Sequence, residues 1–412
     1  MGLVVKIHIA AIILAVLLIP TNYAALRQQF MPDFLPPSIL FGAIIVIAIA
    51  ARRALKVETG IVIPRQLIVQ YLALNAWIVF ALLYSDDFEF GIVKVVEFST
   101  ITMLACFASV HIFGDITGIK SFLGMILFLG ILLAGLCIAG VITFFRPGAD
   151  EQLIGQNYLA IQHIAGLAAI ITLYYFMPRS HGGLRVTLWI LVLMLLMGAL
   201  LVTGGKGPVL TFVVTTIVMA SLSFRHVGLL TVRLTSKAVI IYPLVILFLG
   251  GILLAGILLA FEESAFLHRM DFLLADGNYN LAERVNNIGI AVDLFERHPL
   301  FGAGIGSFAA HAVDIEEADE RMRYPHNILL EVLSELGIIG FVLISCLLYS
   351  SYRCFRRLQN EYERAQEPIV LFACFIFTFL NSLTSQHVAN PALFALIGAP
   401  YGLVRSFSRG SS

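Results

Sequence analysis

The residues best suited to chemistry stand at the end of a long polar segment. His326 lies in Tyr324-Pro325-His326-Asn327, immediately before a new apolar run. Because an unperturbed imidazole has a pKa of about 6.5, this histidine can accept a proton near neutral pH and act as a general base. Pro325 and Asn327 are also typical of helix starts, so the pattern fits a capping segment with an interfacial histidine equally well.

Arg284 lies earlier in the same polar segment. Apolar residues at 281, 285, 288, 292 and 295 recur at helical spacing around it. They predict an amphipathic helix that lies on the outer surface or against the rest of the protein. The guanidinium can bind phosphate through two parallel hydrogen bonds, or it can pair with Glu283 or another neighbouring acid.

Lys206 is a third candidate, in the short turn Thr203-Gly204-Gly205-Lys206-Gly207-Pro208. The turn is not a nucleotide-binding P-loop, because glycine follows the lysine where Ser or Thr is required. Flexible glycines around one cation suit an anion site built partly from backbone N–H groups. The alternative is a lysine at a helix end whose ammonium reaches toward water.

Two further patterns in the polar segment favour a structural interpretation. The glycine-rich run 298–308 lacks the strand–helix context of a dinucleotide site, and we expect its glycines to permit a tight backbone path close to lipid or glycan. The acidic run 314–320 suggests a metal site or a glycosidase-like carboxylate pair. A solvated helix face is the favoured account, because no His or Cys spacing typical of a metal site accompanies it.

Composition determines the class of protein. Hydrophobic residues make up 59% of the 412 and charged residues only 13%, against about 45–50% apolar and about 25% charged in soluble domains. Together with a mean hydropathy of +0.94, this predicts an all-α, polytopic membrane protein. The net charge of zero argues against a nucleic-acid partner.

Apolar runs long enough to cross a hydrocarbon core of about 30 Å predict about twelve transmembrane helices in a single membrane domain, 1–412. The predicted spans are 4–22, 36–51, 66–84, 93–113, 121–145, 155–177, 184–202, 208–224, 238–260, 327–350, 367–384 and 389–404. With both termini in the cytoplasm, most of the 26 Lys and Arg residues fall in inner connections. The long, partly helical loop 261–325, between helices 9 and 10, then lies outside.

Smaller features complete the sequence-based predictions. The first apolar run resembles a signal sequence, but no clear cleavage site follows, and we expect it to be a span. The five cysteines imply no disulfide framework, because none lies in the outer loop. Lys94 and Glu97, three residues apart, are predicted to pair. Further polar residues expected to line an outer, substrate-binding cavity are Arg146, Asn157, Tyr158, Arg323 and His387.

These motifs together resemble a known family. Arg284, the segment His298-Pro299-Leu300-Phe301-Gly302-x-Gly304, and His326-Asn327 followed by Leu330 and Glu335-Leu336-Gly337-Ile338-Ile339-Gly340 are similar to the O-antigen ligase and polymerase family of bacterial envelope glycosyltransferases. The resemblance is strongest over 155–345. It does not separate the branches of the family.

The resemblance implies a glycosyltransferase of the bacterial inner membrane whose active site faces the periplasm. It would take a glycan from an undecaprenyl-diphosphate carrier and pass it to an acceptor, which is lipid A core for a ligase and a second lipid-linked repeat for an O-antigen or exopolysaccharide polymerase. Catalysis would be inverting, without metal or cofactor. The catalytic roles would fall on His326, Arg284 and Lys206, although the family more often has arginine at the last position.

A twelve-helix transporter or lipid-glycan flippase is the alternative from another class. Transporters tend to show paired repeats, broken helices and ionisable residues near the middle of the membrane. Here the ionisable residues cluster outside, and the long loop follows the predicted ninth span. The transferase interpretation is therefore favoured, with a slight preference for ligase over polymerase.

Overall fold

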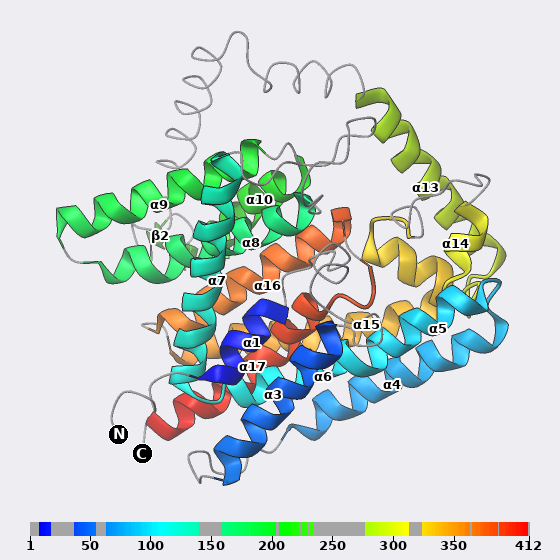
Figure 1. Ribbon diagram of the computed structural model, residues 1–412, viewed down its shortest axis with the longest axis horizontal. Helices are drawn as coiled ribbons and strands as arrows, with labels where there is room; N and C mark the ends of the chain where they lie inside the picture. The colour runs from blue at the N-terminus through cyan, green and yellow to red at the C-terminus, as the bar shows by residue number, and fades with distance from the viewer. Residues whose placement is uncertain are drawn as a thin grey trace.

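The computed structural model is a bundle of helices with one short hairpin (Figure 1). Both chain ends lie on the same side of the bundle, and α13 and α14 lie at the opposite side. The structure describes residues 8–17, 37–54, 63–139, 158–180, 182–202, 206–222, 224–228, 231–234, 277–312, 324–362, 365–385 and 387–410.

The first half of the chain forms consecutive apolar helices, two of which contain a π-helical turn. Their bounds are α1 Ile9–Leu17, α3 Pro37–Ala54, α4 Arg65–Ala81 with η2 Leu82–Tyr84, α5 Phe88–Glu97, η3 Phe98–Thr102, α6 Met103–Ile112 and α7 Ile116–Ile138. They are followed by α8 Tyr158–Ile171 with η4 Thr172–Phe176 and η5 Met177–Arg179, then α9 Gly183–Val202 and α10 Lys206–Leu222.

The described part of the second half contains five further helices. They are α13 Gly277–Arg297, α14 Ser307–Ala312, α15 Ile328–Glu361, α16 Gln366–Ser385 and α17 Pro391–Gly410. The side chain of Asn327 caps α15 by accepting hydrogen bonds from the amides of Leu329 and Leu330 at 3.0 and 3.2 Å. Such a cap satisfies N–H groups that have no partner within the helix.

The all-α, membrane-spanning fold is confirmed. Among the described residues, 7 helices are long and apolar enough to cross a membrane, and three shorter apolar helices lie at Gly42–Ala51, Gly207–Leu222 and Pro391–Phe407. A helix lies within every predicted span except 238–260, which falls outside the described residues. The total of twelve spans stays a prediction.

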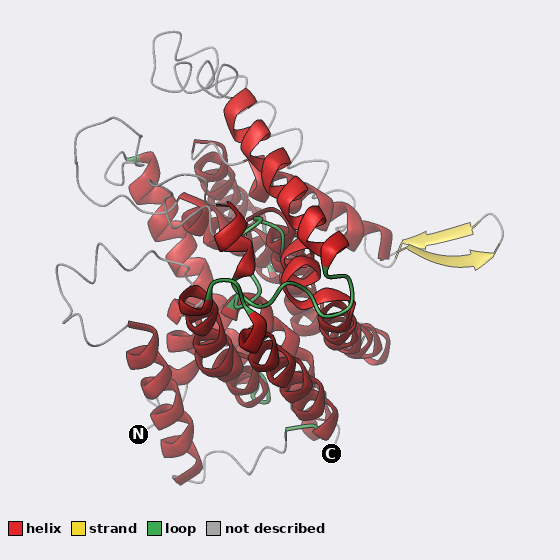
Figure 2. Cartoon of the chain, turned by 90° about the vertical axis from the view of Figure 1, so that its right-hand side faces the viewer, coloured by secondary structure: helices red, strands yellow, loops and turns green. Residues whose placement is uncertain are grey.

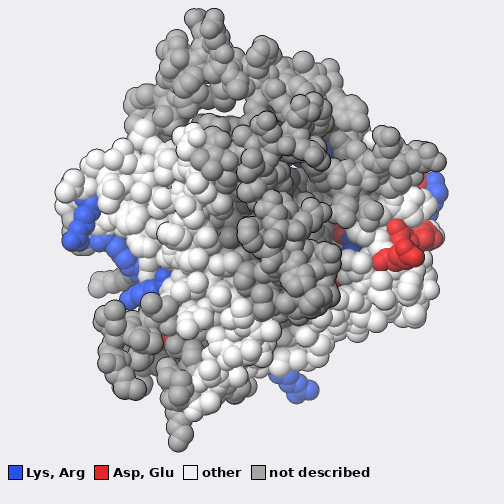
Figure 3. Space-filling view, in the orientation of Figure 1, with Lys and Arg blue, Asp and Glu red and all other residues white. Residues whose placement is uncertain are grey.

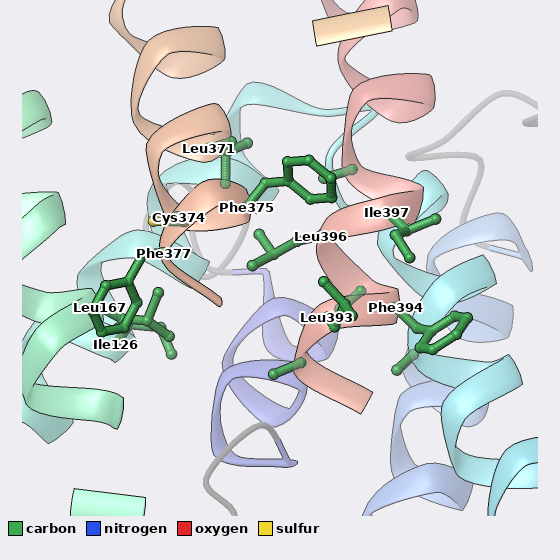
Figure 4. Packing of buried hydrophobic residues seen from close by; sticks show 14 of the residues in the cluster. Ile126, Leu167, Leu371, Cys374, Phe375, Phe377, Leu393, Phe394, Leu396 and Ile397 are labelled. Atoms are coloured by element: carbon green, nitrogen blue, oxygen red, sulfur yellow. The ribbon is translucent and has the colours of Figure 1, made fainter. Parts of the chain in front are cut away.

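The core of the bundle is aliphatic and aromatic. Figure 4 shows Phe375 of α16 between the chains of α16 and α17, with Leu396 and Leu393 of α17 below it. Cys374 is also buried there and, like the other four cysteines, is a free thiol. Inside a bilayer, exclusion of water does not drive helices together. Close packing of such side chains therefore holds these helices in contact.

A two-stranded hairpin projects from the bundle after α10 (Figure 2). Strands β1 Phe224–Gly228 and β2 Thr231–Leu234 pair antiparallel, with Phe224 opposite Leu234. The sequence patterns had not predicted it. It lies in a connection that the distribution of basic residues assigns to the cytoplasm.

Candidate active site

Helix α15 is interrupted at Gly337. Residues 298–304, which we call the outer segment, pack against this interruption. Gly337 has φ 65 and ψ −166, which are not helical values. The residues before it and the residues after it therefore form two helices that meet at a kink. The carbonyls of Ser334 and Glu335 accept hydrogen bonds from the amides of Ala303 and Gly304 at 2.8 and 3.0 Å. Backbone groups released by the kink are thereby satisfied.

The other side of the kink is satisfied in the same way. The amide of Ile338 donates to the carbonyl of Pro299 at 2.9 Å, and that of Ile339 donates to Leu300 at 3.4 Å. Trp77 of α4 donates from Nε1 to the carbonyl of Leu336 at 3.0 Å. Irregular backbone at such a place is tolerated when protein groups replace the missing helical bonds.

The glycines of 298–308 are needed for this docking. A Cβ on Gly302, which has φ 76, would overlap the backbone carbonyl of Glu335, and one on Gly304 would come within 2.6 Å of the Ser85 Cα. The predicted tight backbone path is confirmed, but it runs against α15 and the α4–α5 turn. Protein backbone therefore lies where a side chain on these glycines would point, and the expected closeness of this path to lipid or glycan stays a prediction.

His326 is held in an unusual backbone conformation directly before α15. It has φ 55, and no other non-glycine residue in the described part of the chain has a positive φ. A left-handed conformation costs about 1–2 kcal/mol for a residue with a Cβ, so the surrounding structure must impose it. Asn327 caps the helix, as the alternative interpretation expected, and His326 is left half-buried at its entrance.

Tyr324 connects His326 with His387, which lies between α16 and α17. The Tyr324 ring centroid is 4.6 Å from that of His326, edge to face, and 5.6 Å from that of His387. Burial lowers the pKa of His387, while the charge of Glu97 opposes this and Lys94 adds to it. A predicted catalytic residue and a predicted substrate-binding residue therefore meet, through an aromatic ring that the sequence patterns did not single out as functional.

Arg284 lies on α13, which the amphipathic pattern predicted correctly as a helix. The helix packs on α14 and α15 through Asn287, Ala291 and Leu294. The expected apolar stripe points elsewhere, since Val285 is 60% and Ile288 45% exposed. Arg284 lies three residues before the buried Asn287, so it shares that side of the helix, but its own side chain is exposed.

The remaining predicted site residues are located only in part. Lys206 is the first residue of α10, and Tyr158 is the first residue of α8. The structure describes their backbone but not their side chains. Arg146, Asn157 and Arg323 lie outside the described residues, as do the acidic run 314–320 and the first part of the loop, 261–276.

A buried ion cluster was missed because its members are far apart in sequence. Lys94 does not pair with Glu97, as its spacing had predicted, but binds Glu331 at 2.6 Å and Glu335 at 2.8 Å. Helix α5 begins at Phe88, so Lys94 lies within the helix and faces α15. The only sequence signal was Glu331 and Glu335 at helical spacing after His326.

Comparison with known proteins agrees with this geometry. Residues 189–345 match the family model described as O-antigen ligase. The expected family resemblance is confirmed. This O-antigen ligase region runs from α9 into α15, so it contains Lys206, Arg284, His326 and the kink at Gly337. Tyr158 and His387 lie outside it.

One curated relative points in the same direction. A Rickettsia conorii protein that carries the provisional name polysaccharide ligase is 34% identical over 65 residues. The alignment covers 16% of this chain and 15% of the relative. The likeness is therefore local, and the chain spans only a small part of this relative's length.

Proposed function

We propose that the protein is a membrane glycosyltransferase that moves a glycan from an undecaprenyl-diphosphate carrier to an acceptor at the periplasmic face. The observation that carries the proposal is the presentation of His326 at the entrance of α15, beside Tyr324 and His387 and within the O-antigen ligase region. An unperturbed imidazole can accept a proton near neutral pH, as a general base must.

The proposed reaction is a direct displacement. The acceptor hydroxyl oxygen attacks the anomeric carbon of the glycan, and His326 takes the hydroxyl proton. The bond from the anomeric carbon to the diphosphate oxygen breaks, the carrier diphosphate leaves with the bonding electrons, and the configuration inverts. No metal is invoked in this scheme, and the described residues include no group of three His, Cys, Asp or Glu that could hold one.

Arg284 and Lys206 are proposed to stabilise charge on the departing diphosphate, an electrostatic effect that is often the largest catalytic contribution. The exposed position of Arg284, along the α13 face that approaches α15, supports its role. Lys206 at the start of α10 would add a cation to the free N–H groups of that helix end. Arg146, Asn157, Tyr158, Arg323 and His387 are proposed to bind substrate.

The proposed orientation places both termini in the cytoplasm of a bacterial inner membrane and the site in the periplasm. On the face drawn in Figure 3, most of the visible Lys and Arg lie at the left, toward the projecting end of α9, whereas the visible Asp and Glu lie mainly at the right, toward α5 and α14, with basic atoms beside them. Since basic residues favour the cytoplasmic side, this distribution supports the orientation.

Transfer by the purified, reconstituted protein tests the proposal. Carrier-linked glycan and acceptor should give a covalent product and free undecaprenyl diphosphate. Lys206→Arg should retain most of the rate because the cation remains, whereas Lys206→Ala should lose it. Movement of lipid-linked glycan across the bilayer without any covalent product would instead support the transporter or flippase alternative.

A deletion strain distinguishes the branches of the family. Accumulation of full-length chains on the carrier would indicate a ligase that uses lipid A core. Surface lipid bearing a single repeat would indicate a polymerase that uses a second lipid-linked glycan. We favour the ligase, because the family match and the Rickettsia relative both carry that description.

A further inference from the structure

Three ionisable side chains lie together beneath the candidate active site. Lys94 Nζ is 2.6 Å from Glu331 Oε1, 2.9 Å from Glu335 Oε1 and 2.8 Å from Glu335 Oε2. The exposed fractions of the three side chains are 3%, 1% and 0%. A buried ion pair contributes little to stability by itself, so the contacts that each carboxylate makes show what the cluster holds in place.

The two carboxylates are bound differently. Glu331 uses separate oxygens, with Oε1 on Lys94 and Oε2 accepting the backbone amide of Val388 at 2.8 Å. Glu335 contacts Lys94 through both oxygens, its Oε1 also accepts the amide of Phe308 at 3.3 Å, and the backbone of Gly306 donates to its carboxylate as well. Only Glu331 joins Lys94 to the 387–388 segment, and it uses a separate oxygen for each partner.

The bridge joins the two segments that carry the histidines. The Glu331 amide donates to the Asn327 carbonyl at 2.9 Å, within the first turn of α15, and His326 is the residue before Asn327. Val388 directly follows His387. The contact from Glu331 Oε2 to Val388 thus sets how far the His387 segment lies from the entrance of α15, while Lys94 anchors Glu331 to α5.

We infer that Glu331, anchored by Lys94, is a positioning residue that holds the 387–388 segment against α15 and so fixes His387 relative to His326. The role rests on the proposed function, because it matters for transfer only if these histidines face the substrates. Displacement of a reacting group by about 1 Å costs about 10²-fold in rate, which sets the scale of the expected effect.

Glu331→Gln is the decisive variant and Glu335→Gln is its matched control. Each leaves Lys94 with one carboxylate, so the charge of the cluster changes equally. Glutamine has a single acceptor oxygen. At 335 that oxygen can occupy the Oε1 place and serve both Lys94 and Phe308, but at 331 it must lose either Lys94 or Val388.

In the reconstituted protein, Glu331→Gln should lower kcat about 10- to 100-fold with KM unchanged within about twofold. Glu335→Gln should keep kcat within about threefold of wild type. A merely structural role would lower the amount of folded protein in both variants without this split. Equal losses of kcat in the two variants, or wild-type kcat in Glu331→Gln, would overturn the inference.

Hydrogen exchange at the Val388 amide gives a readout independent of activity. In the full-length protein in detergent, exchange there should be at least about tenfold faster in Glu331→Gln than in wild type, and unchanged in Glu335→Gln. If the wild type makes no product, the proposed function fails while exchange still decides whether Glu331 holds the segment. Unchanged exchange at Val388 would reject the bridge whatever the activity.

Glu331→Asp covers the case in which the glutamine variant does not fold. It keeps the charge and both oxygens but shortens the side chain, so it cannot span Lys94 and Val388 together. A smaller loss of kcat and a smaller acceleration of exchange are expected. Wild-type values for both measurements would count against the positioning role.

Discussion

Gly302 and the backbone carbonyl of Glu335 lie so close together that a single added carbon at residue 302 has no room. The contact seats the outer segment in the kink of α15, next to the amide of Ala303 that bonds the Ser334 carbonyl. Helix α13, which carries Arg284, continues directly into this segment. The close approach therefore fixes where α13 meets the kink of α15.

Gly302→Ala is expected to destabilise the protein by at least about 1–2 kcal/mol, the cost of a Cβ in a left-handed conformation, before any clash is counted. Thermal unfolding in detergent measures the loss. Gly289→Ala in α13 is the control, since a Cβ there meets nothing within 4 Å. That variant should be neutral or slightly stabilising. Equal midpoints for the two variants would contradict the close packing.

His326→Asn should abolish most transfer while preserving the fold. Asparagine tolerates the positive φ of this position better than most residues, but it cannot act as the base. Loss of a general base costs about 10²- to 10⁴-fold in rate. His298→Asn, an exposed position in the outer segment, should remain active. Full transfer by His326→Asn would remove the histidine from the mechanism.

Arg284→Lys should lower kcat roughly tenfold or more, because lysine keeps the charge but loses the two parallel hydrogen bonds to phosphate. The control is Arg297→Lys on the same helix. Arg297 is 62% exposed and pairs with Asp293 at 2.6 Å, so its replacement should leave transfer unchanged. Comparable rates for both lysine variants would assign Arg284 to the solvated surface.

His387 should make stability depend on pH. Burial lowers its pKa in the folded state, and Glu97 only partly opposes this. The unfolded chain then binds the proton more readily, so the stability that His387 contributes is present above its ordinary pKa and is lost as pH falls through the lowered value. The unfolding midpoint should fall on acidification from about pH 7 to 5.

His387→Gln should reduce that acid-dependent fall, whereas His298→Gln at an exposed position should not. The measurement is the unfolding midpoint of each variant across the same pH range. An identical pH dependence for wild type and His387→Gln would show that other groups cause the loss of stability.

The class of protein and most of its helices could be predicted from the order of residues along the chain. Runs of apolar residues such as 184–202 are a local property, because any helix that crosses a bilayer must satisfy its own backbone and present an apolar surface. The capped start of α15 after His326 was equally local, since Asn327 bonds the amides of the next two residues in sequence order. The family motifs could also be recognised, because each is a short run of neighbouring residues.

Which residues meet in space depends on how the helices pack, and it could not be predicted from spacing. Spacing placed Lys94 beside Glu97, but the lysine faces Glu331 and Glu335 of a helix more than two hundred residues later. Periodicity found the apolar stripe of α13 but could not choose the packing face, because burial depends on the neighbouring helices. The left-handed His326 and the kink at Gly337 likewise follow from contacts with distant segments, and sequence spacing carries no information about such contacts.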